Sequence, residues 1–113
     1  MATSDSAPIR VGVVTDLTGA LSFMGTANAN VATMVVDDLN AAGGLLGRPL
    51  ELIIEDSGTD DAMATAAASR LVEHDVDVVL GGIYSSTRQA IKGPVVEQAR
   101  KLYIYPEQYE GQE

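Results

Sequence analysis

Four short apolar segments, separated by stretches with helical spacing, constrain the fold of this 113-residue sequence more than any other feature. The segments are rich in β-branched residues and are apolar nearly throughout, without the two-residue alternation of a half-exposed strand. In order along the chain they are IRVGVVT, RPLELIIED, VDVVLGG and KLYIY. This pattern predicts the strands of a parallel sheet that helices cover on both faces.

The stretches between these segments predict three helices. Residues 26–42 carry apolar side chains at i, i+3, i+4 and i+8, which is one face of a helix: Val31, Met34, Val35 and Leu39. Thr26 is the expected N-cap of this helix, and Gly43–Gly44 the expected end. A second helix is expected from Asp60–Asp61 and a third from Ser85 or Ser86, and Gly93–Pro94 should kink the third.

Alternating strands and helices with right-handed crossovers indicate an α/β fold. We expect an open parallel four-stranded sheet in the order 2-1-3-4 with helices on both faces, as in flavodoxin-like proteins. Gly12 within the first strand indicates close approach by a helix. Residues 1–8 are interpreted as a flexible tail or a remnant introduced by cloning, and residues 9–113 as one unit.

The charge balance excludes some partners. Seven basic residues against sixteen acidic ones give a net charge of −9, which argues against nucleic acid and anionic membranes. The sequence has no cysteine, so it can form neither a disulfide nor a thiolate metal site. It also has neither the glycine-rich dinucleotide fingerprint nor a P-loop, so no cofactor is expected.

Ligands of open parallel sheets bind beyond the carboxyl ends of the strands. The most informative of these ends is Gly81–Gly82, followed by Tyr84, Ser85 and Ser86 at a predicted helix start. The glycines would let the backbone approach a ligand, and the helix start favours an anion or a carbonyl oxygen. The alternative is that one of the serines only caps the helix.

No catalytic constellation is evident, so the chain is not expected to be an enzyme. Neighbouring carboxylates such as Glu55 and Asp56 point to opposite faces of a strand and make a poor pair. A phospho-acceptor receiver of this fold would need an aspartate where the third strand ends in Leu80 and glycines. A small flavodoxin-like receiver or enzyme using Asp16 or Asp56 remains the least favoured alternative.

Several stretches together resemble one family. RVGVVTDLTGALSFMG, VDDLNAAGGLLGRPLELIIEDSGTD, VDVVLGGIYSSTRQA and YPEQYEG are similar to type 1 periplasmic substrate-binding proteins. YSSTRQA with YPEQYEG looks like the narrower branch that binds urea and short-chain amides. The resemblance implies two lobes that close over a small polar solute (urea, an amide or an amino acid) and a membrane permease of an ABC importer as partner. A cytoplasmic amide sensor of the same fold is the runner-up.

The resemblance also assigns site residues. Tyr84 and Ser85 would flank or hydrogen-bond the ligand, and Tyr105 would pack on it or bond to it. Glu107 would accept hydrogen bonds from amide or urea N–H groups, although relatives often carry an uncharged residue there. Arg88 is expected to be structural.

Family members are much longer, so the resemblance implies that residues 9–113 are the N-terminal portion of the first lobe. A one-sided site predicts weak or no ligand binding. An incomplete sheet with an exposed edge predicts a homo-oligomer. The expected location is periplasmic or extracellular, or cytoplasmic for a sensor.

Overall fold

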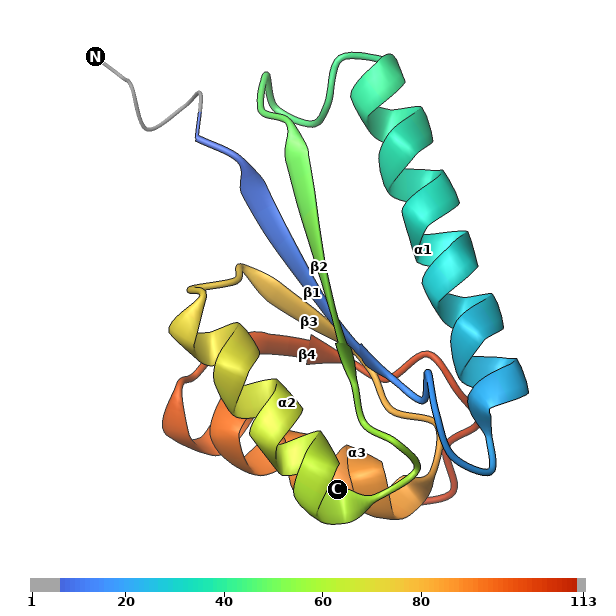
Figure 1. Ribbon diagram of the computed structural model, residues 1–113. Coiled ribbons are helices and arrows are strands. Elements are labelled where there is room, and N and C mark those ends of the chain that lie inside the picture. Colours follow the sequence, from blue (N-terminus) through green and yellow to red (C-terminus); the bar gives the residue numbers. More distant parts are fainter. Residues whose placement is uncertain (1–6, 112–113) are drawn as a thin grey trace.

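The computed structural model describes residues 7–111, which form a four-stranded parallel sheet in the order β2-β1-β3-β4, as predicted. The elements in chain order are β1 (Ile9–Thr15), α1 (Ser22–Ala41), β2 (Leu50–Asp56), α2 (Asp61–Glu73), β3 (Val78–Gly81), α3 (Ser85–Lys92), η2 (Gly93–Gln98) and β4 (Leu102–Ile104). Figure 1 shows α1 on one face of the sheet and α2 and α3 on the other.

The face under α2 and α3 holds the main core. Three alanines of α2 are fully buried there and let the helix lie close to the sheet: Ala64, Ala67 and Ala68. At Gly12 of β1, a Cβ would stand 2.8 Å from Leu71 Cδ1, which confirms the predicted close approach of a helix. The helix begins where predicted, because the Asp60 side chain caps it by accepting from Met63 N–H at 2.8 Å.

Helix α1 begins at Ser22, four residues before the predicted N-cap Thr26. Its N-cap position is Leu21, which makes no side-chain capping bond. Gly25 in the first turn lies against the end of β1, where an added Cβ would be 1.8 Å from the carbonyl oxygen of Asp16. This glycine therefore permits a close contact between helix and strand and does not mark a helix boundary.

The predicted apolar face of α1 is only partly buried. Val36 and Ala29 are covered, whereas Val31, Met34 and Val35 remain about half exposed. The reason is that α1 packs chiefly against β1 and β2. An apolar groove of about 470 Å³ is left between α1 and the β3–β4 side of the sheet, with a lining that includes Val11, Val31, Val35, Leu39, Leu52, Leu80 and Ile104.

The predicted kink after α3 takes the form of a π-helical segment, η2. Pro94 has no N–H to donate, and the widened turn accommodates its ring while Ala99 N–H donates to the Pro94 carbonyl at 3.1 Å. Strand β4 is shorter than expected and was wrongly interpreted as buried: Ile104 is 46% exposed. Leu102 and Ile104 are exposed on the face where α1 leaves the groove open, whereas Tyr103 packs against the core on the opposite face.

Part of the predicted tail is held in place, since the Ala7 and Pro8 carbonyls accept hydrogen bonds from the Arg48 guanidinium. Residues 1–6 lie outside the described residues. Across residues 7–111, no helix is long and apolar enough to cross a membrane.

Candidate functional site

The ends of β1 and β2 are joined by a carboxylate and hydroxyl network. Asp16 is fully buried and accepts from Ser57 Oγ at 2.5 Å and Thr59 Oγ1 at 2.8 Å. Asp56 accepts from Thr18 Oγ1 at 2.6 Å and from the Leu17 and Thr18 backbone N–H groups. Both candidate phospho-acceptor aspartates therefore link the loop after β1 to the loop after β2 through hydrogen bonds.

The pKa of Asp56 lies below its ordinary value. Burial acts to raise this pKa, but hydrogen bonds from the Thr18 hydroxyl and from the Gly58, Thr18 and Leu17 backbone outweigh it. Its neighbour Glu55 instead pairs with Arg70 at 2.8 Å. The two carboxylates thus face different partners, as strand geometry predicts.

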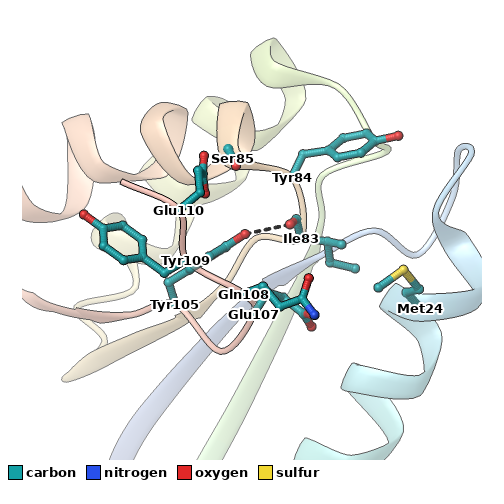
Figure 2. A pocket seen from close by; sticks show the side chains of 9 residues that line it. All are labelled: Met24, Ile83, Tyr84, Ser85, Tyr105, Glu107, Gln108, Tyr109 and Glu110. Atoms are coloured by element: carbon teal, nitrogen blue, oxygen red, sulfur yellow. Dashed lines mark hydrogen bonds between the residues drawn. The ribbon is translucent and has the colours of Figure 1, made fainter. Parts of the chain in front are cut away.

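The ends of β3 and β4 border an open hollow of about 320 Å³ (Figure 2). It contains all four residues that the resemblance assigned to a ligand: Tyr84, Ser85, Tyr105 and Glu107. The rest of its lining was not anticipated and consists of Met24, Ile83, Gln108, Tyr109 and Glu110. The geometry brings the four together, and their contact with a ligand stays a prediction.

Tyr105 forms a fixed wall of this hollow. Its hydroxyl donates to the Ile83 carbonyl at 2.8 Å, as the dashed line in Figure 2 marks. The Arg88 guanidinium lies 4.8 Å from the centre of the Tyr105 ring, a favourable cation–π distance. With its hydroxyl engaged by Ile83, Tyr105 is better suited to pack against a solute than to donate to one.

The serines after β3 do not cap α3, so that alternative is wrong. Tyr84 occupies the N-cap position without a side-chain bond, and Thr87 Oγ1 donates to the Tyr84 carbonyl at 2.8 Å. Ser85 is the first helical residue, and its side chain lines the hollow together with Glu110. Tyr84 itself is 45% exposed, and in Figure 2 its ring points away from the other lining residues.

Glu107 connects the β4 end to α1. Asn28 Nδ2 donates to Glu107 Oε2 at 3.1 Å across the hollow's edge. Gly81 and Gly82 are not among the residues that line the hollow, and their approach to a ligand stays a prediction. A Cβ at Gly81 would meet the Val14 carbonyl, and one at Gly82 would meet the Tyr103 hydroxyl. Gly81 therefore permits close packing of β3 on β1, and Gly82 permits close approach of the Tyr103 side chain and α3.

Glu110 and Arg88 are the pair that the residue-level reasoning missed. Arg88 is 5% exposed and pairs with Glu110 at 3.2 Å, while the Tyr109 ring lies 4.9 Å from its guanidinium. The Ser85 hydroxyl first and Arg88 second lower the pKa of Glu110 to about 2. The sequence signal was an arginine three residues after Ser85, which one helical turn places on the same face.

A parallel α/β sheet with a polar hollow at its strand ends is the architecture of small-molecule-binding α/β proteins. Comparison with known families gives a closer assignment. Residues 8–113 match the family described as periplasmic binding protein, and the chain belongs to this family.

Relatives with known names are binding proteins. The chain is similar to an amino acid binding protein of Pseudomonas aeruginosa, with 29% identity over 94% of this chain and 28% of that protein. It is also similar to the Leu/Ile/Val-binding protein of Escherichia coli, with 32% identity over 72% of this chain and 22% of that protein. These names agree with the prediction of a binding protein rather than an enzyme.

Solved structures support the same fold. A branched-chain amino acid transporter substrate-binding protein from Streptococcus pneumoniae, in complex with isoleucine, superposes with a TM-score of 0.86. Its sequence is 29% identical, and the match covers 92% of this chain and 30% of that one. The chain therefore spans less than a third of the length of these relatives.

Proposed function

We propose that this chain contributes one wall of the solute site of an ABC importer's binding protein, and that the solute is a small neutral amide or urea. The observation that favours this class is the charge of the hollow. Two carboxylates line it, Glu107 and Glu110, and Arg88 beside it is paired with Glu110. An amino acid, which the relatives' names suggest, would bring an ammonium group that suits these carboxylates. It would also bring a carboxylate, and the described residues that line the hollow include no lysine or arginine to receive it.

The hydrogen-bond donors and acceptor of an amide match the polar groups around the hollow. Its NH₂ would donate to Glu107, whose Oε2 already accepts from Asn28. Its carbonyl oxygen would accept from the backbone N–H groups of the first turn of α3, which have no partner within a helix. Its apolar end would pack on the Tyr105 ring.

The affinity should be low. The binding free energy of the best small ligands is about −1.5 kcal/mol per non-hydrogen atom. Acetamide has four such atoms, so its binding free energy is limited to about −6 kcal/mol. An open hollow leaves one side of the ligand in water, so we expect a dissociation constant near the millimolar range, about −4 kcal/mol.

Amide chemical shifts in a two-dimensional NMR titration test this proposal. Acetamide and urea should shift the signals around the hollow at millimolar concentration, and leucine should shift them less. Glu107→Gln should weaken acetamide binding, whereas Glu97→Gln, which removes an exposed carboxylate of η2, should not. Tighter binding of leucine than of acetamide would overturn the amide assignment.

We also propose a periplasmic or extracellular location and a permease partner for the longer protein of this family. The relatives' names favour this transport role over the cytoplasmic sensor. For the 113-residue chain we propose a homo-oligomer, because the β4 edge and the apolar groove beside α1 are both exposed.

A further inference from the structure

The Glu107 carboxylate is held from outside its own segment. Residue 107 belongs to the stretch after β4, which has no regular secondary structure, and its side chain is partly exposed. Glu107 Oε2 accepts from Asn28 Nδ2 at 3.1 Å, and among residues 7–111 Asn28 is the residue that forms a hydrogen bond with it. A glutamate has several accessible rotamers, so without this contact the carboxylate would sample several directions.

The donor of this hydrogen bond stands on a rigid element. Asn28 lies in the second turn of α1, three residues after Gly25, which packs against the backbone of Asp16 at the end of β1. The next residue, Ala29, is buried. An ionised carboxylate only accepts hydrogen bonds, so the Asn28 amide must turn its NH₂ group toward Glu107. The contact between helix and sheet therefore sets the position of the donor, and the donor sets the position of the carboxylate.

We propose that Asn28 is a positioning residue, which fixes the Glu107 carboxylate so that its second oxygen, Oε1, is offered to a ligand N–H group in the hollow. This inference rests on the proposed function in taking Glu107 as the acceptor for the ligand. Asn28 is not among the residues that line the hollow, so it acts on a ligand through Glu107. Because the Asn28 amide is neutral, this contact leaves the negative charge of Glu107 in place, and a charged acceptor binds an N–H group more strongly than a neutral one.

Asn28→Ala removes the donor and keeps a residue that favours a helix. The matched control is Asn30→Ala, because Asn30 is an exposed asparagine two positions further along the same helix. We expect Asn28→Ala to weaken acetamide binding about threefold to tenfold in an NMR titration, which is the net contribution of one hydrogen bond. Asn30→Ala should leave the affinity unchanged.

A double-mutant cycle separates positioning from a structural role. Asn28→Ala is repeated in the Glu107→Ala background, where no carboxylate is left to position. We expect the affinity for acetamide to fall no further in that background. An equal loss in both backgrounds would show that Asn28 acts independently of Glu107, and it overturns the inference.

A second measurement needs no ligand. Three-bond NMR couplings of the Glu107 side chain report its χ1 rotamers, and we expect one rotamer in the wild type and averaging among several in Asn28→Ala. Averaging already in the wild type overturns the inference, whether or not acetamide binds.

The two proposals therefore fail separately. A wild-type chain that does not bind acetamide removes the amide assignment, and the couplings of Glu107 then decide the role of Asn28. Equal acetamide affinities of the wild type and Asn28→Ala remove the role of Asn28 and leave the amide assignment standing.

Discussion

Gly25→Ala tests the contact that places α1 next to the site. An added Cβ would stand 1.8 Å, 2.3 Å and 2.6 Å from the O, C and N atoms of Asp16. All three are backbone atoms, so no rotamer change relieves the overlap, and the start of α1 must move away from the end of β1. That movement would also carry Met24 away from the hollow and Asn28 away from Glu107.

The expected cost follows from these distances. Overpacking costs typically about 1–3 kcal/mol, and a backbone-on-backbone overlap belongs at or above the upper end. Alanine gains about 1 kcal/mol over glycine in helix propensity, so a net loss of about 2 kcal/mol or more remains. For a chain of this size that corresponds to a fall in melting temperature of roughly 10 °C.

Guanidinium unfolding followed by circular dichroism measures this change. The matched control is Thr26→Ala, an exposed neighbour on the same helix, which should alter stability by no more than about 0.5 kcal/mol. An unfolding midpoint for Gly25→Ala equal to or above that of the wild type, with an unchanged slope, would refute the contact between α1 and β1.

Three further predictions concern the site and the groove. The Glu110 pKa of about 2 lies below its ordinary 4.5, so its contribution to stability should be complete above about pH 4.5 and be lost as the pH falls toward 2; an NMR titration midpoint near 4.5 would contradict the pairing with Ser85 and Arg88. Tyr105→Phe removes the donor to the Ile83 carbonyl and should cost about 1 kcal/mol in chemical unfolding; a neutral result would mean that water replaces the hydroxyl. Val35→Lys places a charge in the apolar groove and should reduce self-association measured by light scattering, whereas Val96→Lys, at an exposed valine outside it, should not; equal masses for both variants would remove the groove from the interface.

The sheet could be predicted from the sequence because its strands are apolar throughout and short. That composition suits only a sheet covered on both faces, and the right-handed crossover rule then leaves few orders. The close approach of a helix to β1 could also be predicted from Gly12, because a glycine inside a buried strand often marks such an approach.

The start of α1 and the burial of its apolar face could not be predicted. A glycine such as Gly25 usually indicates a break in a helix. Only the contact with Asp16 explains why it lies inside one here. Val31, Met34 and Val35 have the right periodicity, but periodicity does not tell how much of the face another element covers.

The assignment of four residues to a ligand comes from a family resemblance, and the structure brings these four together around the hollow. Glu110 was missed because its role depends on a chain reversal after β4 that returns it to the start of α3. No local pattern encodes that return. The same limit applied to Ser85, whose hydroxyl does not cap the helix that it begins.

A crystal of the chain soaked in acetamide tests the central claim most directly. The account predicts ligand density in the hollow, with the amide nitrogen within hydrogen-bond distance of Glu107 and the methyl group against the Tyr105 ring. Density only elsewhere, such as in the groove beside α1, or an amide that does not approach Glu107, would contradict it.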